Sequence, residues 1–205
     1  MNKPLRFVTF EGPEGSGKST QAARLAARLR ERGADVTLTR EPGGTELGRR
    51  IRAWLLHRDE PMGHEAEFLL YSADRAEHLR TVVRPALERG GFVISDRFVD
   101  SSYAYQGYGR GLDLDWLRAV SAGILGDVRP ALTFLLDLPP EEGLARLAGR
   151  DRLEGESLAF HRRVRAGYLE LARREPDRWV VLDALSDSET LERRIFEEVS
   201  RRWPA

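Results

Sequence analysis

Residues 12–19 form the stretch of the sequence with the clearest chemical meaning. They read Gly-Pro-Glu-Gly-Ser-Gly-Lys-Ser and match the pattern G-x-x-x-x-G-K-[S/T] of a phosphate-binding loop. Glycines in such a loop let backbone N–H groups approach phosphate oxygens closely, and the following helix directs its free N–H groups to the same oxygens. Lys18 is expected to reach the β- and γ-phosphates of a nucleotide, and the Ser19 hydroxyl to bind Mg²⁺. The residues expected to contact the nucleotide are Gly12, Pro13, Glu14, Gly15, Ser16, Gly17, Lys18, Ser19 and Thr20.

A glycine-rich turn could also match this pattern by chance. Against that alternative, the loop follows an apolar run at residues 7–10 and precedes a helical pattern that begins at Thr20. The use of lysine points the same way, because Lys3 and Lys18 are the only lysines in a chain otherwise rich in Arg. A compact ammonium charge suits a phosphate at a position where a planar fork does not. The loop is therefore interpreted as a site for a nucleoside triphosphate.

Asp96 and Arg97 form a second candidate site, because they directly follow the apolar run at residues 92–95. A carboxylate at the end of a buried strand, beside a phosphate loop, is placed to hold Mg²⁺ or its water shell. Arg97 offers a planar fork for a phosphate group. The alternative is an ion pair on the surface, which the position at a strand end disfavours.

Residues 64–80 are predicted to form a helix that carries Phe68, Tyr71 and Arg75 on one face, at positions i, i+3 and i+7. The two aromatic residues could simply be part of the core, and that reading suits Phe68. Arg75 on the same face needs a partner, since a buried cation is costly without one. An aromatic ring beside an Arg is also an arrangement that stacks on a nucleobase and hydrogen-bonds it. The residues alone leave both readings open.

Composition limits the class of protein. The chain has 205 residues, which suits one domain, and its 33 basic and 33 acidic side chains leave no net charge to attract nucleic acid or a membrane surface. It has no Cys, so disulfides and thiolate metal sites are excluded. No apolar run approaches the length of a membrane span, and the N-terminus runs straight into a predicted strand. We expect a cytoplasmic protein.

The elements that must position these residues alternate along the chain. Strands are predicted at residues 7–10, 36–39, 92–95, 132–137 and 179–183, and helices at 20–32, 45–55, 64–80, 81–89, 113–126, from 139, at 155–174 and at 188–202. Apolar strands separated by helices predict one doubly wound α/β domain over residues 1–205, with a parallel five-stranded sheet flanked by helices. Ligands bind such sheets at the carboxyl ends of the strands. Adenine is accordingly expected near Asp183 and Ala184, after the last strand.

Four stretches together resemble the thymidylate kinases of the bacterial type. They are the phosphate loop, residues 39–45 (Thr-Arg-Glu-Pro-Gly-Gly-Thr), the Asp96-Arg97 pair and residues 104–107 (Ala-Tyr-Gln-Gly). The match runs in order along essentially the whole chain. The resemblance implies the fold of a P-loop nucleoside monophosphate kinase and transfer of a phosphoryl group from Mg-ATP to thymidine monophosphate. The product would be thymidine diphosphate, on the route to dTTP, and the family also implies a homodimer.

Roles for individual residues in the acceptor site follow from this resemblance. Tyr71 is similar in position to the residue that stacks on thymine, and Arg75 to the one that hydrogen-bonds O4 of the base. Ser102 is similar to a polar contact with the base. Tyr105 resembles the ring that crowds the sugar C2′, where a ribose hydroxyl would clash.

The acceptor's phosphate and sugar have further implied partners. Arg97 resembles the clamp on the acceptor phosphate, with Arg40 as a second contact. Glu14 presents a physical difficulty, because a carboxylate inside a phosphate loop repels the ligand unless something holds it. The family offers a role for it, since an acid there accepts a hydrogen bond from the 3′-hydroxyl, whereas the alternative is a solvent-facing filler. Some members have an Arg immediately after this acid, and here that position is Gly15.

The bacterial subtype supplies its catalytic arginine from a lid, which corresponds here to residues 141–157. Residues 146–154 read Arg-Leu-Ala-Gly-Arg-Asp-Arg-Leu-Glu, with Gly149 as a flexible point. Arg150 and Arg152 are the candidates for contact with the transferred phosphoryl group. The alternative is a solvated charged face, because the chain is rich in Arg. The catalytic set expected from the sequence is Lys18, Asp96, Arg97, Arg150 and Arg152.

Two other functions share some of these features. Another small phosphotransferase, such as a deoxynucleoside kinase or a different nucleoside monophosphate kinase, would also have the phosphate loop and lid. A nucleotide-dependent switch would bind ATP or GTP without phosphorylating a small molecule. A GTP switch normally shows an Asn-Lys-x-Asp motif, and Asn2 is the only Asn in this chain.

Overall fold

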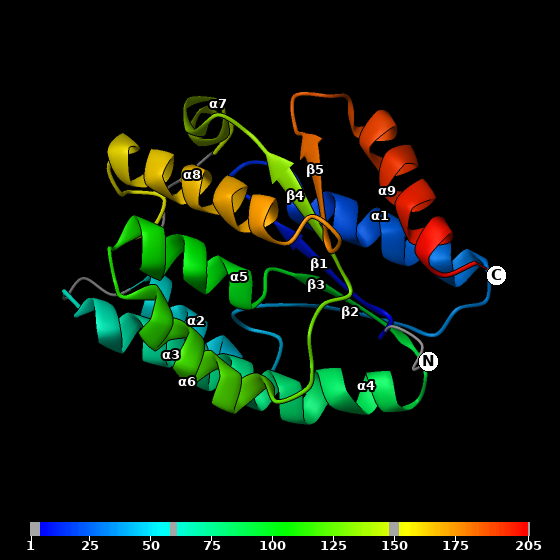
Figure 1. Cartoon of the computed structure of the whole chain (residues 1–205), viewed down its shortest axis with the longest axis horizontal. Coiled ribbons are helices and arrows are strands. Elements are labelled where there is room, and N and C mark those ends of the chain that lie inside the picture. The colour runs from blue at the N-terminus through cyan, green and yellow to red at the C-terminus, as the bar shows by residue number, and fades with distance from the viewer. Residues whose placement is uncertain (1–4, 58–60, 148–151, 205) are drawn as a thin grey trace.

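The computed structural model describes residues 5–57, 61–147 and 152–204. Their centre is a five-stranded sheet in which all strands are parallel and which has helices on both faces (Figure 1). In chain order the strands are β1 (Phe7–Glu11), β2 (Val36–Arg40), β3 (Phe92–Asp96), β4 (Leu132–Asp137) and β5 (Trp179–Asp183). Their order across the sheet is β2-β3-β1-β4-β5. The predicted doubly wound α/β sheet is confirmed, and three strands each extend one residue beyond the predicted end.

Eight α-helices longer than one turn are found among the described residues, and side-chain caps fix the start of several of them. Thr45, Asp113, Ser157 and Asp187 each accept a hydrogen bond from a backbone N–H three residues later, which satisfies a donor that the first helical turn leaves free. The helices are α1 (Lys18–Glu31), α2 (Glu46–Leu56), α3 (His64–His78), α4 (Arg84–Glu88), α6 (Leu114–Leu125), α7 (Pro140–Ala145), α8 (Leu158–Arg174) and α9 (Ser188–Arg202).

Two segments differ from the sequence-based expectation. The helix predicted at residues 81–89 is not separate, because a π-helical turn at Leu79–Val83 (η1) joins α3 directly to α4. Pro85 lacks a backbone N–H, and a widened turn is one way to accommodate that loss within a helix. Residues 99–109 carried no helical prediction, yet they form α5 (Val99–Ser102) and the π-helical segment η2 (Tyr103–Gly109). Single π-helical turns often occur at functional sites.

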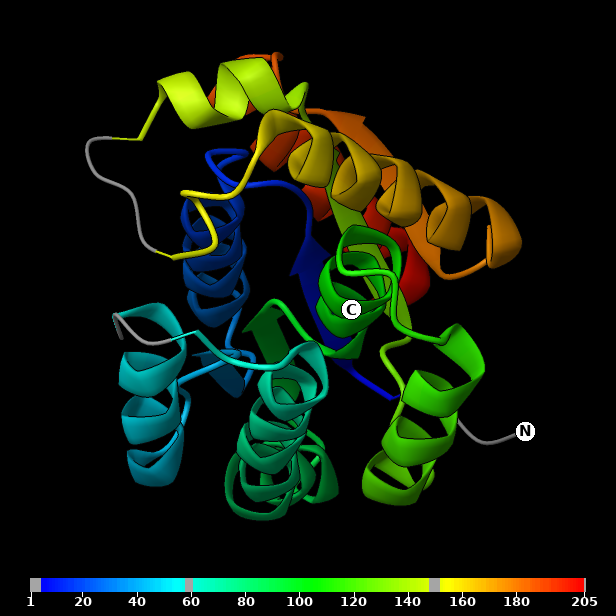
Figure 2. The same ribbon diagram turned by 90° about the vertical axis from the view of Figure 1, so that its left-hand side faces the viewer.

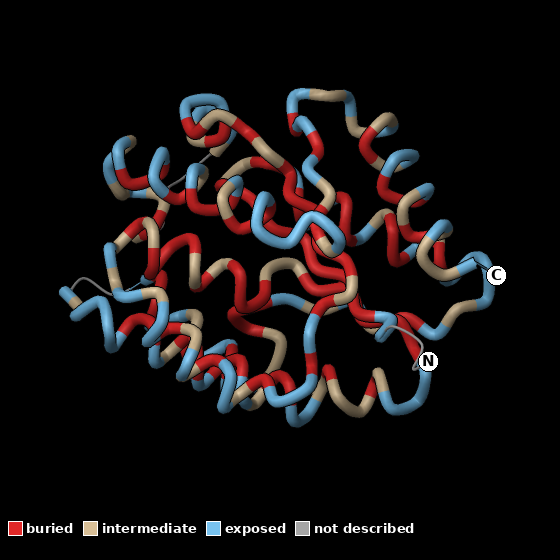
Figure 3. The backbone as a smooth tube through the Cα atoms, viewed as in Figure 1, coloured by how far each residue is buried: buried red, intermediate tan, exposed pale blue. Residues whose placement is uncertain are grey.

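The core lies on both faces of the sheet because alternate strand residues point to opposite sides. Val8, Phe10 and Phe134 pack on the face that α1 and α9 cover. Phe7 and Leu135 pack on the other face, below α3, α5 and α8. Figure 3 shows the buried strands at the centre of the molecule and alternating exposure along the outer helices. In the described ranges, no helix combines the length and the apolar run needed to cross a membrane.

After β1 the chain runs to one side of the sheet, and after β3 it runs to the other side. The carboxyl ends of the strands meet at this switch. The register pairs Phe10 with Asp96 and Arg40 with Asp96, so the ends of β1, β2 and β3 lie together. Figure 2, which looks onto this end, shows α1, α2, α3, α7 and α8 arranged around it. This crevice at the switch in strand order is where ligands bind doubly wound sheets.

Candidate active site

Two adjoining pockets occupy the crevice. The first, here called the phosphate pocket, is lined by residues 14–20 of the loop together with side chains from the ends of β2 and β3. The second, here called the inner pocket, lies between α2, α3 and η2. The side chains that line both pockets are Glu14, Glu41, Arg52 and Arg97.

The phosphate loop has the conformation that its glycines predict. Gly12, Gly15 and Gly17 all have positive φ angles, of 142°, 69° and 86°. Gly15 also packs against α7, since a Cβ at Gly15 would lie 2.3 Å from the carbonyl oxygen of Gly143. Likewise, a Cβ at Gly143 would lie 2.2 Å from the carbonyl oxygen of Glu14. A side chain at position 15 is therefore excluded here, which gives a physical reason for the absence of an Arg after the acid.

Lys18 lies inside the loop with its ammonium group turned toward the backbone. Its Nζ donates to the carbonyl oxygen of Pro13 at 2.7 Å and to the hydroxyl of Ser16 at 3.2 Å. Burial is the main cause that lowers the pKa of Lys18, to about 8, and the Arg97 charge adds to it while Glu14 opposes it. A buried ammonium group at this position is an electrostatic partner for an incoming phosphate.

Ser19 and Asp96 lie together, as the metal prediction requires. The Ser19 hydroxyl donates to Oδ2 of Asp96. Oδ1 of Asp96 is buried and has no hydrogen-bonding partner in residues 5–57, 61–147 or 152–204. The described residues contain no group of three or more His, Cys, Asp or Glu side chains that could hold a metal by themselves. Mg²⁺ in nucleotide sites needs only one or two protein oxygens beside the phosphates, so this pair fits that ion.

Several hydrogen bonds hold the guanidinium group of Arg97 in place. It has a positive φ of 70°, unusual for a residue with a side chain. One terminal nitrogen donates to Glu14 at 2.6 Å, and the other donates to the carbonyl oxygen of Gly12 at 3.2 Å. Burial opposes both charges. The Arg97 charge nevertheless holds the pKa of Glu14 down at about 2, and the Glu14 charge keeps the pKa of Arg97 well above its ordinary value. The two residues therefore form a partly buried ion pair at the boundary of the pockets.

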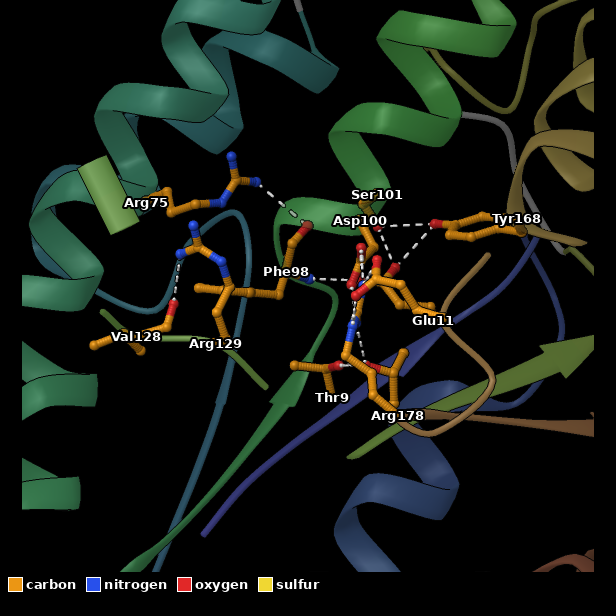
Figure 4. A network of polar contacts seen from close by, with 12 residues as sticks. Thr9, Glu11, Arg75, Phe98, Asp100, Ser101, Val128, Arg129, Tyr168 and Arg178 are labelled. Carbon is orange, nitrogen blue, oxygen red and sulfur yellow. Dashed lines mark hydrogen bonds and ion pairs between the residues drawn. The ribbon is translucent and has the colours of Figure 1, made fainter. Parts of the chain in front are cut away.

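Glu11, which the sequence analysis did not single out, is the last residue of β1 and lies directly behind Arg97. Its carboxylate accepts hydrogen bonds from the backbone N–H of Phe98 at 2.8 Å, from Ser101 at 2.6 Å and from Tyr168 at 3.0 Å (Figure 4). The same two hydroxyl groups accept hydrogen bonds from Arg97. Burial is the main cause that raises the pKa of Glu11 to about 7. Glu11 thus orients the hydroxyls that hold the guanidinium.

The inner pocket brings together the residues predicted to hold the acceptor's base and sugar. Tyr71, Arg75, Ser102 and Tyr105 all line it. Tyr105 donates its hydroxyl to Glu14 at 2.7 Å, at the end of the pocket that faces the phosphate loop. The side chains of Tyr71 and Arg75 therefore line one cavity. Their spacing on α3 alone did not decide between a place in the core and a place in a binding site.

Two further side chains line the inner pocket without having been singled out from the sequence. Arg52 on α2 lines both pockets, and its Nη1 donates to the carbonyl oxygen of Pro42 at 3.2 Å. Gln106 on η2 also lines the cavity, and its amide donates to Glu67 at 2.7 Å. The resemblance in residues 104–107 contained Gln106, but no spacing pattern indicated where its side chain would lie. Arg40, which was predicted, is exposed and lines the phosphate pocket.

Of the two arginines predicted for the lid, the structure describes only Arg152. Arg150 lies outside the described residues. Arg152 donates to the carboxylate of Glu67 and, at 2.8 Å, to the carbonyl oxygen of Leu55, so here it is held against α2 and α3. Arg146, directly after α7, also contacts the phosphate loop, through a hydrogen bond of 3.2 Å from its side chain to the carbonyl oxygen of Gly15.

The residues predicted to contact adenine lie at the end of β5 and directly after it, and they line neither pocket. Asp183 is exposed and accepts a hydrogen bond from the backbone N–H of Leu185 at 2.9 Å. Ala184 is buried in the core cluster below α1 and α9. The role of both residues remains a prediction.

Comparison with known proteins places this geometry in a family. The family model described as thymidylate kinase matches residues 10–195. A curated thymidylate kinase of Deinococcus radiodurans is 56% identical over 202 residues, covering 96% of this chain and 97% of the relative. One of Thermomicrobium roseum is 54% identical over 198 residues, covering 95% and 94%. The solved structure of a thymidylate kinase from Ehrlichia chaffeensis superposes with a TM-score of 0.79 at 33% identity, covering 94% of this chain and 97% of that one.

The raised pKa of Glu11 makes a prediction about stability. A carboxyl whose pKa rises from 4.5 to about 7 on folding favours the folded state below pH 4.5, and that contribution is lost as the pH rises to 7. Relative to a Glu11→Gln variant, the unfolding free energy of the natural protein should fall across this range by about 3 kcal/mol. Urea denaturation of both proteins at several pH values measures the difference. Parallel curves for the two would contradict the assignment.

Proposed function

Because the chain belongs to the thymidylate kinase family and phosphorylates thymidine monophosphate to thymidine diphosphate with ATP, we propose that the two pockets divide the substrates between them. The phosphate pocket binds the phosphates of ATP, and the inner pocket binds thymidine monophosphate. One observation carries this proposal, namely that the pockets adjoin and share Glu14 and Arg97. The reacting groups would then meet at this shared boundary.

The inner pocket suits a thymine base. The Tyr71 ring offers a surface for stacking, and Arg75 offers a buried donor for the O4 carbonyl. Ser102 and Gln106 are polar groups within reach of the same cavity. Tyr105 lies at the end next to Glu14, where the sugar would lie, and we assign its ring the role of excluding a 2′-hydroxyl.

The acceptor's 5′-phosphate is assigned to Arg97, with Arg40 and Arg52 as further contacts. These three guanidinium groups line the phosphate pocket, and planar forks bind phosphate oxygens in pairs. Glu14 would accept a hydrogen bond from the 3′-hydroxyl. Its pKa of about 2 means that it stays ionised and available as an acceptor at neutral pH.

Phosphoryl transfer then depends on position and charge. An oxygen of the acceptor phosphate attacks the γ-phosphorus of ATP, a new P–O bond forms, and the bond to the β–γ bridging oxygen breaks to release ADP. Lys18 and the backbone N–H groups of the loop stabilise the negative charge on the moving group. We assign residues 141–157 as a lid within this single domain, with Arg150 and Arg152 as the residues that bring further positive charge to it.

Mg²⁺ is proposed to bind beside Ser19 and Asp96. The free oxygen of Asp96 and the hydroxyl of Ser19 are oxygen donors of the kind this ion prefers. When bound, the ion would neutralise charge on the β- and γ-phosphates. Adenine is assigned to the region after β5, near Asp183 and Ala184.

A homodimer is proposed through the outer face of α2, α3 and α6. These helices lie side by side, and they expose large apolar side chains, led by Trp54 at 67% exposure. The other large apolar residues that these helices expose are Leu47, Leu69 and Trp116. Scattered apolar side chains are common on surfaces, but several on neighbouring helices indicate an interface. A cytoplasmic location is proposed with it.

Lys18 is expected to be essential for turnover. Lys18→Ala should lower kcat by about 100-fold or more, because one preorganised charge contributes several kcal/mol to the transition state. Lys18→Arg, which keeps the charge but not its compact shape, should recover little of the loss. Steady-state rates of ADP formation measure both, with circular dichroism as the check on folding. Near-normal rates in Lys18→Ala would contradict the placement of ATP in the phosphate pocket.

Tyr105 is expected to discriminate between sugars. Tyr105→Ala should raise kcat/KM for the ribonucleotide acceptor relative to the deoxyribonucleotide by about tenfold, because the ring no longer fills the space beside C2′. Tyr105→Phe keeps the ring and should leave the ratio close to that of the natural protein. An unchanged ratio in Tyr105→Ala would show that the sugar is read elsewhere.

A further inference from the structure

The roles proposed above for the two pockets do not explain why a carboxylate, Glu41, lies beside them. It follows β2 and is 3% exposed, although its carboxylate lines the inner pocket. Its Oε2 accepts a hydrogen bond from Nε of Arg75 at 2.8 Å, and its Oε1 contacts Nδ1 of His78 at 2.8 Å. Both oxygens are therefore engaged by α3.

The other side of the Arg75 guanidinium is fixed as well. Its Nη2 donates to the hydroxyl of Ser102 at 3.1 Å and to the carbonyl oxygen of Phe98 at 3.3 Å. Its Nη1 is buried and has no partner in the part of the chain that the structure describes. A buried donor without a partner is expensive, so the molecule must gain something from it, such as a role in binding or catalysis. The inner pocket, which Arg75 lines, offers the space for such a ligand.

Because of the shape of a guanidinium group, these contacts set the direction of its remaining N–H groups. The group is planar, so fixing Nε and Nη2 also fixes the direction of Nη1. Without Glu41, Arg75 would be a buried cation without a paired carboxylate and would turn toward other acceptors. The direction of the free N–H thus depends on the carboxylate.

Glu41 is itself held by the segment from which it comes. Nε2 of His78 lies 2.7 Å from the hydroxyl of Thr39, two residues before Glu41. A Cβ at Gly44 would lie 2.8 Å from Cδ2 of His78, so this backbone packs closely on the imidazole ring. A chain of contacts runs from Thr39 through His78 and Glu41 to Arg75.

We infer that Glu41 is a positioning residue, which aims the free N–H of Arg75 at the carbonyl at position 4 of the acceptor's base. This inference rests on the proposed binding of the acceptor in the inner pocket. An acceptor with an amino group at that position, such as dCMP, would leave the donor unpaired. Sites that read a polar group in this way discriminate strongly against its absence. Glu41 therefore affects the choice of base as well as affinity.

A double-mutant cycle tests the inference. KM for thymidine monophosphate, KM for ATP and the ratio of kcat/KM for dTMP over dCMP are measured for Arg75→Ala, Glu41→Ala and the double variant. Glu41→Ala should raise KM for thymidine monophosphate at least tenfold and lower the ratio, with KM for ATP changed less than twofold. If Glu41 acts only through Arg75, the double variant loses no more than Arg75→Ala alone.

Two further variants keep the test decisive if Glu41→Ala folds poorly. Glu41→Gln retains an acceptor for Arg75 but not the charge, and it should give a smaller rise in KM in the same direction. Asp100→Asn is the matched control, because Asp100 is another buried carboxylate paired with an arginine, Arg178, but does not line the inner pocket. It should lower thermal stability without changing the ratio of dTMP over dCMP.

Each contradicting outcome has a separate meaning. Independent, additive losses for Glu41 and Arg75 would overturn the positioning role and leave the proposed function standing. A ratio of dTMP over dCMP that Glu41→Ala and Glu41→Gln leave unchanged, while Arg75→Ala lowers it, would do the same. If Arg75→Ala itself changes neither KM nor the ratio, the placement of the acceptor's base in the inner pocket is wrong and the positioning role is lost with it.

Discussion

The site depends on the burial of opposite charges at the ends of β1 and β3. Glu11, Glu14, Lys18 and Arg97 are all largely removed from water, and each has partners that offset at least part of the cost. Removing one partner from such a group leaves the remaining charges buried without compensation, which is strongly unfavourable. In return, the charges are already oriented before a ligand arrives. Catalysis by preorganised charge requires an arrangement of this kind.

The fold supplies that arrangement through the order of its strands. Because β1 lies between β3 and β4, the phosphate loop after β1 sits beside the Asp96-Arg97 turn after β3. Tyr168 then ties α8 to Glu11, while Gly143 ties α7 to the phosphate loop. The segment proposed as a lid therefore contacts the phosphate loop through α7, and the helix that follows it contacts Glu11.

Much of this could be predicted from the sequence where the signal is local. The five apolar runs, the phosphate loop and Asp96 at a strand end need only neighbouring residues to be recognised. Glu11 could not be recognised, because its partners Ser101 and Tyr168 are distant in sequence. The η2 segment was missed because its Tyr and Gly residues are poor helix formers that packing holds in place. Contacts made only by the folded chain leave no periodic pattern.

The proposed binding mode places the base of thymidine monophosphate in the inner pocket and its phosphate at Arg97. A crystal structure with thymidine monophosphate and a non-hydrolysable ATP analogue tests it most directly. Thymine is expected to stack on Tyr71, with O4 within hydrogen-bonding distance of Nη1 of Arg75 and the 5′-phosphate at Arg97. A base bound outside this cavity, or a phosphate away from Arg97, would contradict it.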